Sequence, residues 1–225
     1  MASLPLVQLA LDFPSIDEAL QAAELGVQAG VDILEAGTPL IVAEGLRSIG
    51  ALATAFPEMK ILADYKTMDS GFKNVLLTKA QGGHYMTVCA NSPDETVQSA
   101  IRKGKESGIY VVTDTIGVKD QAARARQCAE WGVDMVYIHY GADQRRADDS
   151  RDSNQWTEEI IAAVNCPVGV ATFDVADAII AVQKGAALVA IGHPIVGTDQ
   201  ASFEKLQAYV ERVKSAGCDS QAILP

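Results

Sequence analysis

The segment "ILADYKTMDSG", residues 61–71, begins as an apolar run and ends with two carboxylates and an ammonium group. Asp64 and Lys66 are two positions apart, so on an extended strand their side chains would share one face, with Tyr65 on the other. Asp69 follows three residues later, in the expected loop. A lysine held among carboxylates stays protonated and can stabilise a developing enolate electrostatically. A structural cluster of salt bridges is the alternative interpretation.

Other short apolar runs also end in a titratable residue. Asp12 follows "LVQLAL", Glu35 lies in "DILEAG", Asp114 ends "YVVTD" and His139 ends "VYIH". A single carboxylate at such a position is often a helix cap or a solvated strand end. In a parallel barrel, however, the carboxyl ends of all strands meet at one mouth. The repeated placement therefore favours one shared site.

Two of these carboxylates suggest a metal, and two histidines suggest further roles. Glu35 and Asp64 end neighbouring runs, and two hard oxygen ligands with room for water suit Mg²⁺. No cluster of histidines suits zinc. His139 is a candidate general acid/base, with a buried structural histidine as the alternative. His193, after the last apolar run, is placed to lie near an anion, because barrels often hold phosphate between their last two loops.

The elements that must position these residues alternate along the whole chain. Near-continuous apolar runs separated by amphipathic stretches are typical of a parallel sheet covered on both faces. Eight such runs occupy residues 6–12, 32–37, 60–66, 84–90, 110–117, 134–141, 167–174 and 188–194. They predict a (β/α)₈ barrel as one domain over residues 1–225. An open doubly wound sheet is the alternative, but no G-x-G-x-x-G turn follows an early run.

Two segments between the runs carry more specific signals. Residues 15–30 are expected to form a helix that begins after Ser15, with Glu18 three positions on, and ends at Gly30. Residues 141–155, "GADQRRADDSRDSNQ", are too polar for a core. They predict either a solvated loop or a lid over the active site.

Composition excludes several classes of partner. The chain of 225 residues has a formal net charge of −11, which disfavours nucleic acid and anionic membranes as partners. No apolar run approaches the roughly 20 residues of a membrane span, and the N-terminal residues make a poor signal peptide. The four cysteines form no C-x-x-C pair and are expected to be free thiols in a reducing compartment. The expected location is cytoplasmic.

Six motifs together resemble the orotidine 5′-monophosphate decarboxylase suprafamily. They are "LALD", "EAGTPL", "EGLR", "LADYKTMDSG", "VVTDTIGVKD" and "VYIHYGADQ". The branch they resemble contains 3-hexulose-6-phosphate synthase and 3-keto-L-gulonate-6-phosphate decarboxylase, and the D-x-K-x-x-D run is the most specific part. The resemblance implies a (β/α)₈ barrel that acts on a sugar phosphate as a homodimer with shared active sites.

The resemblance also implies a role for each polar residue of these motifs. These roles are Mg²⁺ ligation by Glu35 and Asp64, contact of Lys66 with a 1,2-enediolate, entry of Asp69 into the partner subunit's site, contact of Asp12 with substrate or Lys66, and acid/base catalysis by His139. The further substrate-binding positions are Asp114, Ala171, Thr172, Gly192 and His193.

Three positions distinguish the two activities of this branch. Decarboxylases carry Glu where this chain has Asp114, Arg where it has Ala142, and Thr where it has Ala171. The resemblance therefore favours the synthase, a Mg²⁺-dependent aldolase that joins formaldehyde and ribulose 5-phosphate through a 1,2-enediolate. A decarboxylase of a 3-keto sugar acid 6-phosphate is the first alternative. A non-catalytic barrel that binds a sugar phosphate is the second.

The loops after the seventh and eighth runs depart from the family pattern. Thr172 and Phe173 stand where the family has two glycines, and His193 follows Gly192 where the family has Gly or Arg. Backbone amides approach an oxyanion closely only where no side chain intrudes. We expect this chain to hold its anion less through loop amides and more through His193, helped by Arg145 or Arg146.

Overall fold

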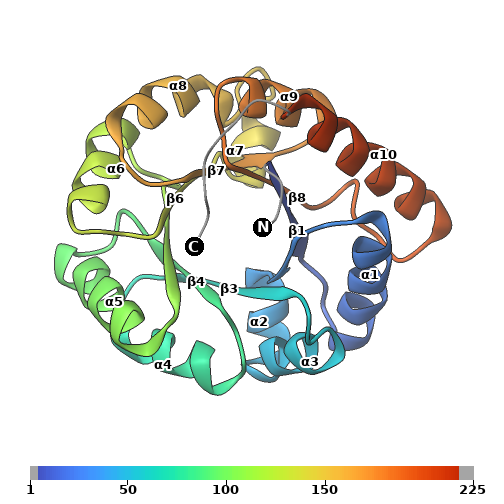
Figure 1. Ribbon diagram of the computed structural model, residues 1–225, viewed down its shortest axis with the longest axis horizontal. Coiled ribbons are helices and arrows are strands. Elements are labelled where there is room, and N and C mark those ends of the chain that lie inside the picture. Colours follow the sequence, from blue (N-terminus) through green and yellow to red (C-terminus); the bar gives the residue numbers. More distant parts are fainter. Residues whose placement is uncertain (1–4, 218–225) are drawn as a thin grey trace.

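Eight parallel strands pair in chain order and close into a barrel in the computed structural model, which describes residues 5–217 (Figure 1). The last strand pairs with the first, so no strand edge is left open. The strands are β1 (Leu6–Leu11), β2 (Ile33–Ala36), β3 (Lys60–Thr67), β4 (Tyr85–Cys89), β5 (Tyr110–Asp114), β6 (Met135–Ile138), β7 (Val168–Thr172) and β8 (Leu188–Ile191). All eight lie within or beside the predicted apolar runs, and the predicted (β/α)₈ barrel is confirmed.

Helices form a ring around the strands (Figure 1). They are α1 (Ile16–Ala29), α2 (Thr38–Glu44), α3 (Arg47–Ala55), α4 (Gly71–Ala80), α5 (Asp94–Ser107), α6 (Gln121–Glu130), α7 (Ala142–Ala147), α8 (Asn154–Ala163), α9 (Val175–Gln183) and α10 (Gln200–Ala216). None of the helices in the described part of the chain is long and apolar enough to cross a membrane.

Local capping explains where α1 begins and ends. The Ser15 hydroxyl accepts a hydrogen bond from the Glu18 amide at 3.3 Å, which satisfies one of the free amides of the first turn. Gly30 adopts a left-handed conformation, with φ 89°, that favours glycine and stops the helix. The predicted helix over 15–30 is confirmed.

The two-residue period of the strands separates core from site. On β2, Ile33 belongs to the apolar cluster inside the barrel, whereas Leu34 and Ala36 pack outward against the helices. Glu35 shares the face of Ile33 one step nearer the carboxyl end of the strand. The same alternation carries Asp64 above Leu62 on β3. Polar groups at the strand ends therefore lie over a closed apolar floor.

The polar segment 141–155 is not a loop throughout. Residues 142–147 form the short helix α7, and α8 begins at Asn154. The Tyr140 hydroxyl donates to the carbonyl oxygens of Gln144 at 3.2 Å or Asp148 at 3.4 Å, so the segment is tied to the end of β6. Cys89, Cys128 and Cys166 are free thiols, and Cys218 lies outside the described residues.

Candidate active site

A pocket of about 310 Å³ opens at the carboxyl ends of the strands. Its inner half contains the titratable residues Asp12, Glu35, Asp64, Lys66 and His139. Its outer half is formed by the β7 and β8 exits and by α7, with Arg146, Ala171, Thr172, Phe173, Gly192 and His193. Nine of the eleven sequence-predicted site residues line this one pocket, and Asp69 and Asp114 do not.

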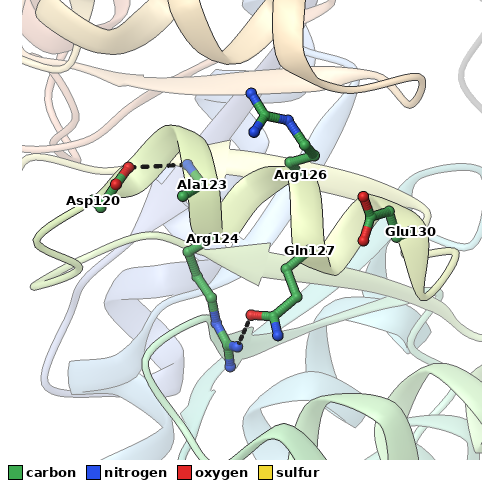
Figure 2. A pocket seen from close by; sticks show the side chains of 6 residues that line it. All are labelled: Asp120, Ala123, Arg124, Arg126, Gln127 and Glu130. Atoms are coloured by element: carbon green, nitrogen blue, oxygen red, sulfur yellow. Dashed lines mark hydrogen bonds between the residues drawn. The ribbon is translucent and has the colours of Figure 1, made fainter.

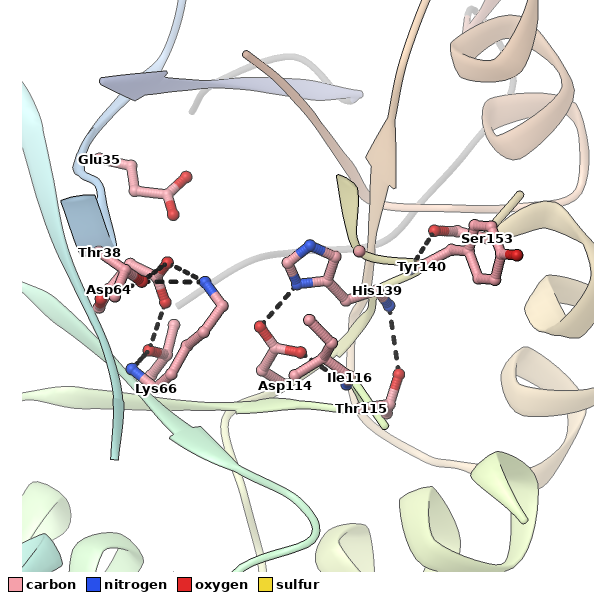
Figure 3. Close-up of polar contacts among 12 residues, drawn as sticks. Glu35, Thr38, Asp64, Lys66, Asp114, Thr115, Ile116, His139, Tyr140 and Ser153 are labelled. Carbon is pink, nitrogen blue, oxygen red and sulfur yellow. Dashed lines mark hydrogen bonds and ion pairs between the residues drawn. The ribbon is translucent and has the colours of Figure 1, made fainter. Parts of the chain in front are cut away.

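An ion pair at the end of β3 forms the centre of the inner half (Figure 3). The Lys66 ammonium donates to Asp64 Oδ2 and, at 3.0 Å, to the Thr38 hydroxyl. Asp64 also accepts hydrogen bonds of 2.7 Å from the hydroxyls of Thr38 and Thr87. Burial by itself would raise the pKa of Asp64, but Lys66 and these donors outweigh it and hold the pKa below its usual value.

Lys66 itself stays protonated. Burial favours the neutral amine, but the negative charges of Asp64, Asp114 and Glu35 outweigh burial and raise the pKa of Lys66 above its usual value. The result is a fixed ammonium that faces the pocket at neutral pH.

The backbone of β3 is distorted where it presents this lysine. The pairing with β4 shifts between Ala63 and Thr67, and Lys66 has φ 47°, in the left-handed region that favours glycine. The Lys66 amide donates to the Thr87 hydroxyl at 2.9 Å, which holds the distortion in place. Such a conformation costs on the order of 1–3 kcal/mol and is concentrated at functional sites. Tyr65 turns to the opposite face, toward the outer core, as expected.

A second pair faces the first across the pocket (Figure 3). His139 Nδ1 lies 2.8 Å from Asp114 Oδ2, and the other oxygen of Asp114 accepts from the Ile116 amide at 2.8 Å. Asp114 is almost fully buried behind the imidazole, so it contacts the histidine and does not line the pocket. A carboxylate at Nδ1 keeps the proton there and leaves Nε2 to exchange a proton with a substrate.

Glu35 is a buried carboxylate whose negative charge has few stabilising partners. Its one hydrogen-bond donor among the described residues is Gln8, whose amide lies 2.7 Å from Oε2. Burial, then Asp64, then Asp12 raise the pKa of Glu35 well above its usual value. Figure 3 shows the carboxylate pointing into the same space as Lys66 and His139.

This charge balance tests whether a divalent cation fits. Burial and the charge of Asp64 also raise the pKa of Asp12, so three carboxylates face the pocket and compete for one ammonium. No group of three or more His, Cys, Asp or Glu side chains among residues 5–217 is arranged to hold a metal. The surplus of carboxylates over ammonium groups is the feature that suits a divalent cation, and Mg²⁺ accepts one or two carboxylates when water and substrate supply its other ligands.

Sequence reasoning missed the neutral residues that hold these charges. Gln8 orients Glu35, and Thr38 and Thr87 orient Asp64 and Lys66. One signal was available for two of them: Gln8 and Thr87 are polar residues within otherwise apolar runs. Gln8 lies four residues before Asp12, and Thr87 lies two residues before Cys89. Side chains at even separations on a strand share one face, so Gln8 and Thr87 face inward on β1 and β4.

Asp69 does not line the pocket. It is exposed on the loop between β3 and α4, where its Oδ1 accepts the Ser70 amide at 2.6 Å. Beside it, Met68, Phe72 and Leu76 are 50%, 41% and 46% exposed. Their spacing of four residues places these apolar side chains along one side of α4 and its approach.

A larger hollow, about 460 Å³, lies on the outer surface of α6 (Figure 2). It is lined by Asp120, Ala123, Arg124, Arg126, Gln127 and Glu130. All six belong to α6 or its capping residue, so no second element converges on the hollow. Arg124 is already bound to Asp94 at 2.6 Å and to the Ser92 carbonyl at 3.0 Å. The strand-end pocket, which gathers residues from seven elements or their exits, is the candidate active site.

Two relatives illustrate the similarity in sequence to known proteins. A 3-hexulose-6-phosphate synthase of Bacillus subtilis is 36% identical over 137 residues, which are 61% of this chain and 65% of that protein. The match thus spans just under two thirds of this relative. A 3-hexulose-6-phosphate synthase of Staphylococcus epidermidis is 31% identical over 166 residues, 73% of this chain and 78% of the relative.

Solved structures show the same similarity at the level of the fold. The 3-hexulose-6-phosphate synthase of Salmonella typhimurium superposes with a TM-score of 0.85 at 30% identity, over 96% of this chain and 99% of that chain. A 3-keto-L-gulonate-6-phosphate decarboxylase of Vibrio cholerae, at 20% identity and a TM-score of 0.77 over 93% of this chain and 98% of that one, shares the fold. Residues 5–209 match the family described as orotidine 5′-phosphate decarboxylase / HUMPS, and the chain belongs to that family.

Proposed function

We propose that this protein is a Mg²⁺-dependent carbon–carbon lyase of the 3-hexulose-6-phosphate synthase type, which joins formaldehyde to ribulose 5-phosphate through a 1,2-enediolate. The observation that carries the proposal is the pairing of a fixed ammonium, Lys66, with an oriented imidazole, His139, in one pocket. The names of the relatives at 30% identity or more support the synthase chemistry.

His139 carries out the proton transfers in this proposal. Its Nε2 removes a proton from C1 of the ketose, and the electron pair of the C–H bond forms the enediolate. The N–H at Nδ1 keeps donating its hydrogen bond to Asp114, whose negative charge stabilises the imidazolium that forms. C1 of the enediolate then attacks the carbon of formaldehyde. The new alkoxide takes the proton back from Nε2, which restores the neutral imidazole.

Lys66 stabilises the negative charge that develops on the enediolate. Asp64, Thr38 and the distorted β3 backbone hold the ammonium in place before substrate arrives, so little reorganisation is needed during the reaction. Preorganised donors of this kind contribute about 10²–10³-fold to kcat. Asp12 faces the same space and is placed to accept a substrate hydroxyl.

Glu35 and Asp64 would hold the Mg²⁺ ion. When bound, the ion supplies a positive charge that polarises the ketose oxygens and compensates the three carboxylates of the pocket. Gln8 and Thr87 would keep the two ligands oriented.

The proposal includes a homodimer with shared sites. Asp69 is exposed and lies outside its own pocket, and the half-exposed Met68, Phe72 and Leu76 lie on the same loop and on α4, which follows it. An apolar face next to an unused carboxylate fits a second copy of the chain, into whose site Asp69 would reach.

The direct test is condensation of formaldehyde with ribulose 5-phosphate. We expect a hexulose phosphate product whose formation stops with a chelator and returns with Mg²⁺. Lys66→Ala should lower kcat by about 10²-fold or more, whereas Lys103→Ala, a lysine on α5 paired with Glu106, should not. Circular dichroism checks that both variants are folded.

Two outcomes would contradict the proposal. Loss of CO₂ from a 3-keto sugar acid phosphate, without condensation, would favour the decarboxylase. Binding of a sugar phosphate without either reaction would indicate a non-catalytic barrel.

A further inference from the structure

The outer half of the pocket has unusual chemistry for an anion site. Barrels often bind phosphate through backbone amides of the loops after β7 and β8. Amides can do this only if they are free of other acceptors and if no side chain blocks the approach. Both conditions can be examined in this chain.

Three of the amides that follow β7 are already occupied. The Phe173 amide donates to the carboxylate of Asp177 at 3.3 Å. The amides of Ala176 and Asp177 donate to Asp174 Oδ1 at 2.8 and 2.9 Å. Two carboxylates therefore satisfy these three amides. They also place negative charge there, which repels a phosphate.

Side chains block the same turn. The Thr172 hydroxyl bonds to the Ala190 carbonyl and to the buried Tyr209 hydroxyl, both at 2.8 Å, so it is already engaged. The Phe173 ring lines the pocket, and the guanidinium of Arg145 lies 5.2 Å from its centre. A phosphate at this turn would meet an aromatic ring and two carboxylates rather than free amides.

Two cationic or ionisable side chains remain available in the outer half. Arg146 on α7 and His193 after β8 both line the pocket. The partner of Arg146 is Asp143, 2.9 Å away, and both side chains of this pair are highly exposed. Exposed pairs of this kind contribute little, so a substrate anion can replace Asp143. Arg145 is less available, because it stacks on Phe173 and donates to the Arg151 carbonyl at 2.8 Å.

We propose that the phosphate of the substrate is held by a side-chain clamp, Arg146 from α7 and His193 from the β8 exit, and not by the amides of the β7–α9 turn. This inference rests on the proposed function for the identity of the substrate. Arg146 forms paired charge-assisted bonds with two phosphate oxygens, and His193 donates a third bond.

The test compares the affinity of a phosphorylated and an unphosphorylated pentose by calorimetry. Ribose 5-phosphate and ribose serve as probes, so the measurement needs no turnover. Arg146→Gln and His193→Gln should each weaken binding of ribose 5-phosphate about 10- to 100-fold, with no change for ribose. Arg146→Lys should recover part of the affinity. Arg126→Gln, an exposed arginine on α6, is the matched control and should bind like the parent.

The outcomes separate this inference from the proposed function. Equal affinity of the parent and the two Gln variants for ribose 5-phosphate would overturn the clamp, as would equal affinity of the parent for the two pentoses. A parent that binds ribose 5-phosphate through Arg146 and His193, yet does not condense formaldehyde with ribulose 5-phosphate, would overturn the proposed synthase and leave the clamp supported.

Discussion

Two carboxylates at the strand ends, one in the pocket and one behind it, act through a cationic or ionisable partner rather than alone. Asp64 fixes the ammonium of Lys66, and Asp114 fixes the imidazole of His139. Neutral donors fill the remaining positions around both: threonine hydroxyls at Asp64 and the Ile116 amide at Asp114. A buried ion pair is favourable only when such additional bonds are present. The ammonium and the imidazole are therefore both held in place before substrate arrives.

The first prediction concerns Asp114→Asn. The amide of asparagine can donate to Nδ1 of His139, which would favour the tautomer with its proton on Nε2 and remove the base from the pocket. We expect kcat for condensation to fall on the order of 10²- to 10⁴-fold with little change in KM. Steady-state kinetics with ribulose 5-phosphate and formaldehyde measure both.

The matched control is Asp94→Asn, which removes an ion-paired carboxylate on α5, outside the pocket. Its kcat should equal that of the parent. An unchanged kcat in Asp114→Asn would contradict the role of Asp114 as the orienting group of His139.

At this scale the sequence predicts charged residues better than neutral ones. Carboxylates, lysine and histidine at strand ends are conspicuous, because such groups are rarely buried without a partner. Gln8, Thr38 and Thr87 carry no charge, and their role depends on which strand lies beside which. The position of Asp114 behind His139 likewise depends on packing between β5 and β6, which no local pattern reveals.

The β7–α9 turn is the element most different from the expected phosphate grip. Asp177 lies within it, buried beside Asp174, and accepts the Phe173 amide. Burial, followed by the charge of Asp174, raises the pKa of Asp177 to about 6. In the unfolded chain this carboxyl titrates near 3.8, the ordinary value. Between pH 3.8 and about 6, the folded state therefore keeps a proton on Asp177 that the unfolded state has lost.

The second prediction follows from this sign. The contribution of Asp177 to stability falls as pH rises from about 4 to about 6, and above that range its charge is a constant penalty. Asp177→Asn removes the penalty and keeps an acceptor for the Phe173 amide. We expect the free energy of unfolding to rise by about 1 kcal/mol at pH 7.5 and hardly at all at pH 4. The gain is smaller than the pKa shift alone implies, because solvent screens charges near the surface. Urea unfolding at the two pH values measures this.

Asp149→Asn serves as the control, because this exposed aspartate of the neighbouring segment has the same charge. It should give no gain at either pH. A gain in Asp177→Asn that is equal at pH 4 and pH 7.5 would contradict the account of the turn.

The sequence predicts the strands most completely. Short apolar runs that recur regularly between amphipathic stretches are typical of parallel strands alternating with helices. The Lys66 distortion is a different case: Asp64 and Lys66 reach one pocket as the two-residue period predicts, but through a bulge rather than a regular strand. Residues 142–147 became a helix although the segment is too polar for a core, because α7 requires only its own backbone bonds and the anchor of Tyr140.

At the scale of the whole molecule, an apolar face lies on α4 and the loop before it, which follows the end of β3. Met68, Phe72 and Leu76 remain about half exposed there in the isolated chain. A second copy of the chain would cover them and bring its Asp69 toward the neighbouring pocket.

The third prediction is that Phe72→Glu separates the subunits. A buried charge at the centre of an apolar interface lacks a partner, so we expect the dissociation constant to rise on the order of 100-fold or more. Sedimentation velocity over a concentration series measures it. Ile180→Glu, a similarly exposed apolar residue on α9, is the control and should leave the dimer intact. A monomeric parent protein would contradict the proposal of shared sites.

The fourth prediction concerns the sharing itself. Asp69→Ala and Lys66→Ala are each expected to be inactive, because each lacks one residue of every site. After mixing and subunit exchange, some hybrid sites contain both residues, and part of the activity should return. Absence of recovery after mass spectrometry has verified exchange would show that Asp69 acts within its own subunit or not at all.

The most direct test of the central claim is exchange of the C1 proton of ribulose 5-phosphate with deuterium. The protein is incubated with the ketose and Mg²⁺ in D₂O without formaldehyde, and proton NMR follows the C1 signal. If Lys66 and His139 generate an enediolate, C1 exchanges in the parent, stops exchanging with a chelator, and does not exchange in His139→Gln. An unexchanged C1 proton in the presence of Mg²⁺, or equal exchange in His139→Gln, would contradict the claim that this pocket forms an enediolate.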